Sequence, residues 1–351
     1  MIPDNENKGS LFHSRVLIFV ILLIILFAVF ILDIFLGSVK IKAADVVRAL
    51  LADHNSNTGI IIMKFRLPRA FTALLVGISL SLGGLYMQTL FRNPMAGPYV
   101  MGVSSGASLG VAIVILGFSA GIVPANIQSL GNWVLVVSSW TGAGAVMLLI
   151  MVVSSRVRDI MTILILGIML GSGISAVVSI MQYFSSETML KAYVIWTMGS
   201  LGNLSAGQLK VMLISVTVGL LLSISLVKML DALLLGETYA SSIGLNVKRA
   251  RNLVFITTSI LAGSVTAFCG PIGFLGIAVP HITRNIFRTS AHATLVPGTL
   301  VTGGILMLIS DLVSQLPGKE VVLPVNSVTS LIGIPVVIWV ILRNKRDSGI
   351  Y

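Results

Sequence analysis

The stretch KMLDALLLGETYASSIGLNVKRAR, residues Lys228 to Arg251, is the longest polar and charged interval between two strongly apolar segments of the chain. Gly236 and Glu237 interrupt an apolar run, and the small residues Ala240 to Ser242 precede Gly244. This pattern is typical of a short helix against which another protein packs. We therefore interpret the stretch as a contact surface that joins two membrane spans, and not as a passive linker.

Composition places the rest of the chain in a membrane. Of its 351 residues, 56% are hydrophobic and only 10% are charged, with a mean hydropathy of +1.02, whereas soluble domains carry about 25% charged residues. These values predict an all-α polytopic membrane protein. The single cysteine, Cys269, has no intrachain disulfide partner. The net charge of +11 is spread over short loops without a basic run, so we expect no nucleic-acid partner.

Apolar stretches of the length that crosses a bilayer, about 20 helical residues, predict about ten transmembrane helices. The first stretch, Val16–Leu36, lacks the short apolar core and cleavage site of a signal peptide, so we expect it to be retained. Two stretches are short and Pro280 interrupts one of them, which indicates helices that neighbours bury or that line a cavity. The predicted spans are Val16–Leu36, Ala70–Phe91, Ser104–Phe118, Asn132–Ser154, Met161–Tyr183, Leu209–Met229, Leu253–Phe268, Leu275–Ile286, Leu295–Leu312 and Ser327–Leu342.

The distribution of basic residues predicts the orientation of these spans. A transmembrane domain at 16–343 leaves tails at 1–15 and 344–351. With the N-terminus in the cytoplasm, the inside loops hold fourteen of the 23 Lys and Arg residues and the outside loops nine. Because cytoplasmic loops are enriched in Lys and Arg, we expect both termini in the cytoplasm. The outside loop 37–69 breaks the rule with six basic residues, which indicates an acidic partner.

The ionisable residues indicate that energy comes from another subunit. A proton- or sodium-driven carrier keeps carboxylates or histidines in mid-membrane, but Asp33 and Asp311 lie toward span ends. The chain has no Gly-Lys-Ser/Thr phosphate loop and no nucleophile elbow, and we interpret His281 as structural. These features favour the membrane half of an ATP-driven importer. An ion-coupled secondary transporter and a non-transporting membrane scaffold are the alternatives.

Four blocks of sequence resemble the FecCD-type permeases, the membrane subunits of ABC importers for iron siderophores, haem and cobalamin. The resemblance implies a type II ABC importer permease fold and covers nearly the whole chain. It also implies that the chain is not an enzyme and holds no cofactor, because ATP and Mg²⁺ bind to a partner ATPase. The blocks are RLPRAFTALLVGISLSLGGLYMQTLFRNPMAGPYVMGVSSGAS (Arg66–Ser108), LLGETYASSIGLNVKRAR (Leu234–Arg251), GPIGFLGIAVPHITR (Gly270–Arg284) and LPVNSVTSLIGIPVVIW (Leu323–Trp339).

The resemblance assigns the contact with the ATPase to a coupling segment at 231–249. The family's Gly-Glu-x-Ala-x-x-Leu-Gly motif forms two short coupling helices that sit in a cleft of the ATPase. The matching residues of this chain are Gly236, Glu237, Ala240 and Gly244. Glycines allow the turns on either side of such a helix, and the small side chain of Ala240 allows close approach.

The resemblance also implies a docking site outside and a constriction inside. Arg66 and Arg69 match arginines that pair with acidic residues of a substrate-binding protein, a contact that the bidentate guanidinium favours. Gln315 occupies the place of a further docking arginine found in some members. Asn93 and Met95 match residues that narrow the inner end of the transport pathway.

The partners that the resemblance implies complete the expected assembly. They are a second copy of the chain, two ABC ATPase subunits, a periplasmic or lipid-anchored substrate-binding protein, the metal-chelate substrate and membrane lipid. The expected location is the cytoplasmic membrane of a bacterium or archaeon, with the chain crossing it several times. The identity of the chelate is left open, because siderophore, haem and cobalamin permeases share the four blocks.

Overall fold

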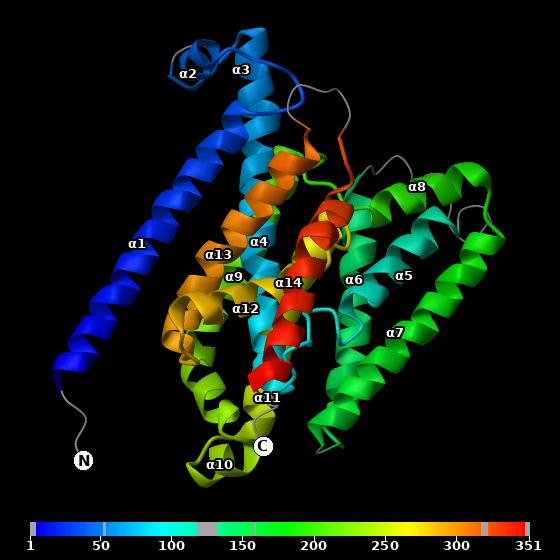
Figure 1. The fold of residues 1–351 in the computed structure, drawn as a ribbon. Coiled ribbons are helices and arrows are strands. Elements are labelled where there is room, and N and C mark those ends of the chain that lie inside the picture. Colours follow the sequence, from blue (N-terminus) through cyan, green and yellow to red (C-terminus); the bar gives the residue numbers. More distant parts are fainter. Residues whose placement is uncertain (1–4, 52–53, 118–131, 158, 317–321, 348–351) are drawn as a thin grey trace.

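The computed structural model describes residues 5–51, 54–117, 132–157, 159–316 and 322–347. Within these ranges every regular element is a helix, and the long helices run side by side in a bundle (Figure 1). The elements are α1 (Asn5–Phe35), α2 (Ala43–Leu51), α3 (Asn57–Ile61), the π-helix η1 (Ile62–Arg66), α4 (Leu67–Leu90), α5 (Val103–Ile115), α6 (Asn132–Ser154), α7 (Ile160–Tyr183), α8 (Glu187–Thr197), α9 (Ala206–Leu234), α10 (Glu237–Ser242), α11 (Val247–Cys269), α12 (Leu275–Phe287), α13 (His292–Ser314) and α14 (Val325–Asp347).

Each of the ten predicted spans coincides with a helix, namely α1, α4, α5, α6, α7, α9, α11, α12, α13 and α14. Seven helices in the described ranges are long and apolar enough to cross a membrane. The shorter ones are α5 and α12, with 13 residues each, and the apolar part of α14, Val325–Trp339. The predicted all-α polytopic fold is confirmed. Residue 118, the last of the span Ser104–Phe118, lies outside the described residues.

Short helices in the loops were not predicted. The outside loop 37–69 contains α2, α3 and η1, and α8 follows α7. α2 is amphipathic: it buries Val46 and Ala49 and exposes Arg48, so its average polarity hides it from a search for spans. η1 continues into α4 without a break, which places Arg66 and Arg69 one helical turn apart on the same face.

α4 is the central helix of the bundle. The most apolar part of the α3–α4 span is 83% buried, whereas that of α1 is 11% buried. Glycines allow its neighbours to come close: a Cβ atom on Gly77 would lie 2.2 Å from the Gly303 carbonyl oxygen of α13. A Cβ on Gly84 would lie 1.8 Å from the Gly276 carbonyl oxygen of α12. Small residues therefore fix two helix crossings on α4, as they do in many membrane proteins.

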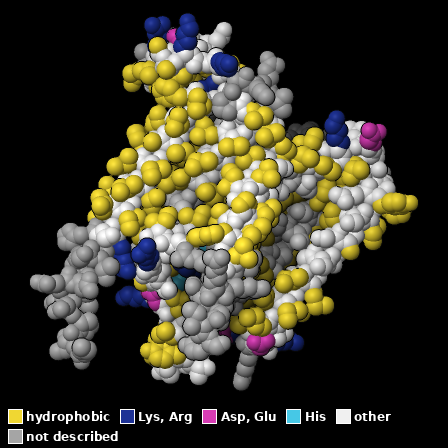
Figure 2. Space-filling model, in the orientation of Figure 1, with side chains coloured by type: hydrophobic (Ala, Val, Ile, Leu, Met, Phe, Trp, Pro, Cys, Tyr) yellow, Lys and Arg dark blue, Asp and Glu magenta, His cyan; other side chains and the backbone are white. Residues whose placement is uncertain are grey.

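The two ends of the bundle carry different structures. α10, the start of α1 and the end of α14 lie at one end, which we call the inner end (Figure 1). α2, α3 and α8 lie at the opposite end, which we call the outer end. Figure 2 shows a broad hydrophobic surface between the ends and Lys and Arg side chains at both. α1 begins at Asn5 and α14 continues to Asp347, so helix extends into both predicted tails. The orientation in the membrane stays a prediction.

Candidate functional site

Two glycine turns delimit the coupling segment at the inner end. α9 ends at Leu234, and Gly236 follows with a φ angle of +115°. The six residues Glu237–Ser242 form α10, and Gly244 has a φ angle of +87° before α11 begins at Val247. Because glycine adopts positive φ at little cost, both turns depend on these two residues.

The coupling segment contains one short helix, not the two that the resemblance implied. After Gly244, Leu245 and Asn246 lead directly into the continuous helix α11, which begins at Val247. The side chain of Asn246 caps the first turn of α11 by accepting a hydrogen bond of 3.0 Å from the Arg249 backbone N–H. An N-cap of this kind starts a helix, and no Gly or Pro occurs before Gly263 to end it.

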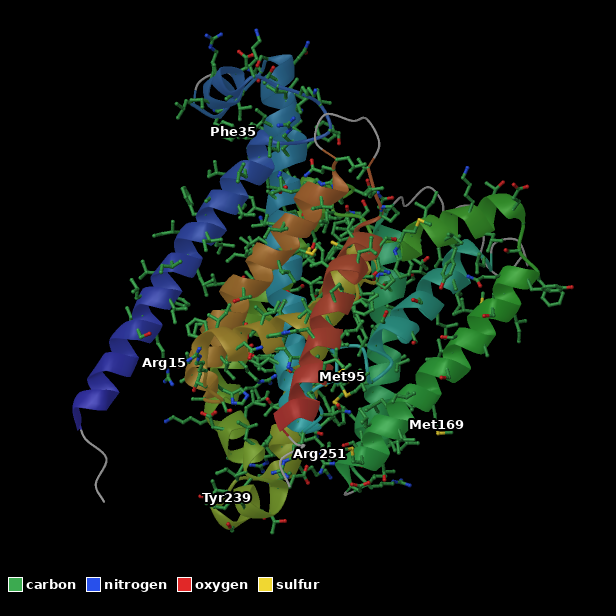
Figure 3. The ribbon with its side chains drawn as sticks, viewed as in Figure 1. Arg15, Phe35, Met95, Met169, Tyr239 and Arg251 are labelled. Atoms are coloured by element: carbon green, nitrogen blue, oxygen red, sulfur yellow. The ribbon has the colours of Figure 1, made fainter. Side chains whose placement is uncertain are left out.

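The exposed surface of the coupling segment includes three large side chains, beside polar ones such as Ser241 and Ser242. The Leu235, Tyr239 and Ile243 side chains are half or more exposed, and Figure 3 shows Tyr239 at the extremity of the inner end. In contrast, Gly236 and Ala240 are buried within the chain itself. The two small residues therefore hold α10 against its own bundle, and the large ones offer a surface that suits a protein partner.

Glu237 is the first residue of α10, and one of its carboxylate oxygens is unpaired among the described residues. Its Oε1 atom is buried and has no hydrogen-bond partner among the described residues. A carboxylate in the first turn of a helix is favoured by the helix dipole. The carboxylate of Glu237 thus stabilises α10.

The candidate constriction is a tight turn that follows α4. Arg92 has a φ angle of +48°, and the Asn93 side chain accepts a hydrogen bond of 2.9 Å from the Met95 backbone N–H. An Asn that bonds to the backbone two residues on is a common turn former. Met95 is exposed, and Figure 3 places it low in the bundle, toward α10. The geometry gives Asn93 a structural function in the turn, and the constriction stays a prediction.

α12 anchors this turn from one side. The His281 Nε2 atom donates a hydrogen bond of 2.8 Å to the Pro94 carbonyl. One turn earlier in α4, the Gln88 side chain donates to the Ile277 carbonyl at 3.2 Å and accepts from the Arg284 guanidinium at 2.6 Å. These contacts agree with the interpretation of His281 as a structural residue.

At the outer end, the side chain of Arg66 points into the protein. Only 6% of the residue is exposed, and its guanidinium donates to the carbonyls of Ile34 at 2.9 Å, Phe35 at 2.8 Å and Val39. These carbonyls belong to the last turn of α1 and the residues after it, which lack N–H donors from their own helix. Arg66 therefore caps α1 in the described structure, and its function in docking stays a prediction.

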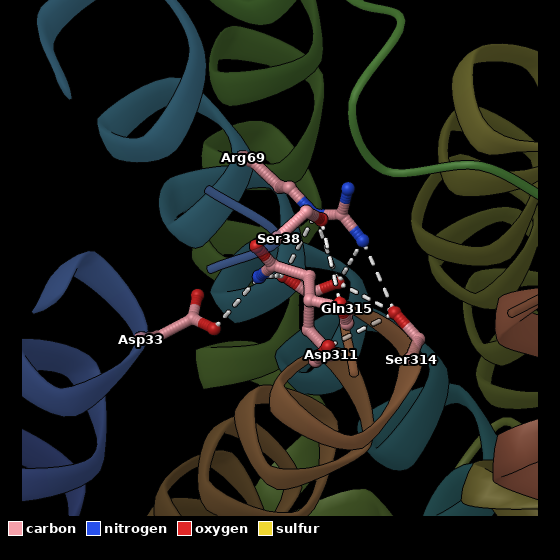
Figure 4. Close-up of polar contacts among 6 residues, drawn as sticks. All are labelled: Asp33, Ser38, Arg69, Asp311, Ser314 and Gln315. Atoms are coloured by element: carbon pink, nitrogen blue, oxygen red, sulfur yellow. Dashed lines mark hydrogen bonds and ion pairs between the residues drawn. The ribbon is translucent and has the colours of Figure 1, made fainter. Parts of the chain in front are cut away.

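Arg69 forms a bidentate ion pair with a buried carboxylate. Its Nε lies 3.0 Å and its Nη2 lies 2.7 Å from Asp311 Oδ1 on α13, and Nη2 also donates to Ser314 Oγ at 3.1 Å (Figure 4). Asp311 is fully buried. Two parallel N–H donors on one carboxylate give strong and directional bonds. The pair joins α4 to α13, and Nη1 of Arg69 has no hydrogen-bond acceptor among the described residues.

A second carboxylate joins this cluster through Gln315. The Gln315 Nε2 atom donates to Asp311 Oδ2 at 3.0 Å and to Asp33 Oδ1 at 3.2 Å (Figure 4). Asp33 is 2% exposed, and its Oδ2 has no partner among the described residues. From the sequence we could identify only that Asp33 and Asp311 lie near the ends of predicted spans and that Gln315 takes the place of a docking arginine. The spacing of four residues from Asp311 to Gln315, one face of α13, was the available signal.

Several basic residues remain accessible at the outer end. Lys40, Lys42, Arg48 and Lys64 are exposed on α2, η1 and the segment before α2. These four residues are most of the six basic residues in the outside loop 37–69, which departs from the positive-inside rule. An acidic partner at this end would meet these four side chains first.

Hydroxyl groups line a cavity of about 290 Å³ between α5, α7 and α8. α7 exposes Ser172, Ser175 and Ser179 along the side of the bundle, and each of these hydroxyls bonds to its own helix backbone. Among the described residues, no group of three or more His, Cys, Asp or Glu side chains could hold a metal ion. The cavity walls are uncharged, and they include Ser104, Ser105, Ser108, Ser175, Ser179, Gln182, Tyr193 and Thr197.

The helical bundle, the glycine-bounded helix at one end and the basic surface at the other define a polytopic membrane permease. The model of the FecCD transport family matches residues 22–343, and the chain belongs to this family. Permeases of the family are the membrane translocation subunits of ABC importers, in which a partner ATPase hydrolyses ATP.

Relatives of known name agree with this assignment. The vitamin B12 import system permease protein BtuC of Citrobacter koseri is 35% identical over 286 residues, 81% of this chain and 84% of that protein. A protein of Methanocaldococcus jannaschii, provisionally named as an ABC transporter permease, is 31% identical over 97% of this chain and 98% of its own. A solved structure described as an inward-facing conformation of an ABC transporter, provisionally assigned to the metal-chelate type, has a TM-score of 0.78 and 26% identity, and the match covers 94% of this chain and 99% of that one.

Proposed function

We propose that this chain is the permease subunit of an ATP-driven importer for an iron-siderophore, haem or cobalamin-type metal chelate. The observation that carries the proposal is α10, a short helix held between two glycine turns and flanked by exposed apolar side chains, in a chain of the FecCD family. The names of the relatives, for vitamin B12 import and for a metal-chelate type transporter, support a chelate as the cargo. ATP and Mg²⁺ bind to the partner ATPase in this proposal, and the permease needs no cofactor of its own.

The proposed assembly contains two copies of the chain around one pathway. α7 supports this arrangement, because only 22% of its most apolar part is buried and its exposed face carries serines. In a membrane, polar faces of helices turn toward other helices or toward water-filled paths. An uncharged, hydroxyl-lined surface suits a large chelate that must bind weakly enough to leave. The expected location is a bacterial or archaeal cytoplasmic membrane, with both termini inside.

The proposed cycle is alternating access. Two ATPase subunits bind at the inner end and close on ATP, which displaces the coupling segments of the two permeases. The bundles then rock against each other, so that the outer gate opens as the inner gate shuts, a rigid-body transition of a common kind. Asn93 and Met95 would form the inner gate, and a periplasmic or lipid-anchored binding protein would deliver the chelate at the outer end.

The contact with the ATPase rests on the coupling segment 231–249. Gly236 and Gly244 permit the turns that project α10 from the inner end. Ala240 packs the helix against the bundle, and Glu237 keeps an unpaired carboxylate oxygen. The exposed Tyr239 would supply much of the buried apolar area of the interface, since aromatic residues are enriched at such contacts.

Glu237→Arg is expected to abolish ATPase association and ATP-dependent uptake. The change places a second guanidinium beside that of Arg92, which lies against Gly236, and removes the free carboxylate. Co-purification with the ATPase and chelate uptake into proteoliposomes loaded with ATP measure the two effects. Glu187→Arg is the matched control, because Glu187 also opens a short helix but at the outer end.

The same experiment tests the class of transporter. Uptake by the wild-type permease without its ATPase would contradict the proposal and favour the ion-coupled carrier. Normal assembly and uptake by Glu237→Arg would remove α10 from the ATPase contact. An unchanged Glu187→Arg protein shows that charge reversal at a helix start does not itself disturb folding.

We place the docking of the binding protein at the outer end, around Arg66 and Arg69. Arg69 contributes through its unengaged Nη1, and Arg66 holds the end of α1 in position. The exposed Lys40 and Lys64 supply charge around the two arginines. Charges at the rim of an interface mainly set association rate and specificity, which suits a contact that must also release.

The double charge reversal Lys40→Glu with Lys64→Glu is expected to weaken capture of the binding protein about tenfold at low salt, because rim charges steer association. The difference should shrink at about 1 M salt, where the Debye length is about 3 Å. Surface-immobilised permease and a salt series measure it. Lys228→Glu is the control, since this lysine lies in α9 near its inner end. Equal affinity of both variants at low salt would reject docking on this surface.

A further inference from the structure

The end of α4 is bonded directly to the end of α9. The Nη2 atom of Arg92 donates a hydrogen bond of 3.0 Å to the carbonyl of Leu234, the last residue of α9. Arg92 immediately precedes Asn93, and Leu234 lies three residues before Glu237. One hydrogen bond therefore joins the predicted gate turn to the residues that lead into α10.

A second bridge joins the same two helices through a buried histidine. His292 opens α13 and is 1% exposed. Its Nδ1 lies 2.7 Å from Asp231 Oδ1 on α9, and its backbone N–H donates to the same oxygen at 2.8 Å. Its Nε2 lies 2.9 Å from Thr89 Oγ1 in the last turn of α4. Imidazole, carboxylate and hydroxyl thus connect three helices at the inner end.

The backbone at Gly236 leaves room for the first bridge. A Cβ atom on this residue would lie 2.7 Å from Arg92 Nη2. The φ angle of +115° already favours glycine here, but the close guanidinium is a separate reason. The glycine that starts the coupling helix is also the residue that allows Arg92 to reach α9.

The gate turn is held on its other side by a different element. His281 of α12 donates to the Pro94 carbonyl at 2.8 Å, whereas Arg92 binds α9. The turn therefore lies between two anchors. A displacement of the α9–α10 junction relative to α12 must change the geometry of the turn, because each anchor is a directional hydrogen bond to its backbone or to the residue beside it.

We propose that these two bridges transmit the movement of α10 to the gate turn within one protomer. We call them the inner linkage, which consists of Thr89, Arg92, Asp231, Leu234 and His292. The inference rests on the proposed function, since it needs an ATPase that displaces α10. It assigns Arg92 and His292 as positioning residues for transport, which act through the turn at 93–95 and do not touch the chelate. Coupling of this kind travels through contacts that connect two movable elements.

The test compares transport with ATP hydrolysis in the complete permease–ATPase complex. Arg92→Met removes the donor at similar length, and Thr89→Val removes the hydroxyl at similar volume. Arg288→Met is the matched control, because Arg288 also has positive φ, +46°, and no described residue accepts a hydrogen bond from its side chain. The double variant Arg92→Met with Thr89→Val is expected to assemble with the ATPase and hydrolyse ATP at half the wild-type rate or more. Chelate molecules imported per ATP are expected to fall at least tenfold.

Rescue separates transmission from simple support of the fold. Arg92→Lys retains a donor that reaches the Leu234 carbonyl, so we expect it to restore most of the transport per ATP that Arg92→Met loses. Wild-type transport per ATP in the double variant would overturn the inner linkage. Loss of assembly or folding in both Arg92→Met and Thr89→Val would overturn it too, because the residues would then be structural. Failure of the proposed function is distinct, since the wild-type complex itself would then show no ATP-dependent uptake.

Discussion

Replacing Asp311 by alanine is expected to lower the free energy of unfolding by about 3–5 kcal/mol, because removing one partner of a buried ion pair leaves the other charge uncompensated. Asp311 is fully buried and receives three bonds from Arg69 as well as one from Gln315. The alanine would leave the Arg69 guanidinium without its carboxylate partner in a buried site. The midpoint of unfolding in detergent and the yield of monodisperse protein measure the loss.

A double variant provides the control for this effect. Asp311→Val combined with Arg69→Met removes both charges and puts apolar side chains in their place, and apolar replacements of buried ion pairs are often neutral. We therefore expect the double variant to regain most of the stability that Asp311→Ala loses. If the double variant were as unstable as the single one, the destabilisation would come from packing and not from the stranded guanidinium of Arg69.

Gly84→Ala is expected to prevent most of the chain from reaching its folded state. The new Cβ would lie 1.8 Å from the Gly276 carbonyl oxygen, and a backbone atom cannot move aside without shifting α12. Overpacking of a well-packed interior costs about 1–3 kcal/mol and occasionally more. Because the clash is with the backbone of a neighbouring helix, we expect this substitution to destabilise the fold by about 3 kcal/mol or more. Size-exclusion profiles and unfolding midpoints in detergent measure it.

Gly144→Ala is the matched control for Gly84→Ala. Gly144 also lies inside a long membrane helix, α6, but a Cβ there would meet nothing within 4 Å. Alanine favours a helix over glycine by about 1 kcal/mol, so the folded yield should stay level or rise. Equal yields from the two variants would show that the crossing of α4 and α12 tolerates a wider separation.

The class of the molecule and the location of its helices were predictable from local sequence. Ten apolar stretches coincide with ten helices, because burial in lipid requires long runs of apolar residues whatever the packing. The glycine turn at Gly236 was predictable for a similar reason, since its backbone conformation depends on the residue itself. The amphipathic α2 was not predicted, because its polarity, averaged over nine residues, is ordinary for a loop.

The orientation of individual side chains was not predictable. Arg66 and Arg69 are alike in the sequence, one helical turn apart, but Arg66 caps α1 and Arg69 pairs with α13. A guanidinium on a long, flexible stem takes the acceptors that the fold brings to it, and the acceptors of Arg69 are 242 residues away along the chain. His292 is similar, since neither Asp231 nor Thr89 is near it in sequence.

The amino-acid sequence by itself determined that this protein is an all-helical membrane permease of the FecCD type and where its apolar helices lie, and it predicted the position of the coupling segment. Apolar length, glycine turns and family motifs are properties of contiguous residues, so they can be identified before the chain folds. Only the tertiary structure decided which polar side chains meet. The buried cluster around Asp311 and the inner linkage around His292 arise from helices distant in sequence, and their hydrogen bonds exist only where packing brings donor and acceptor within about 3 Å.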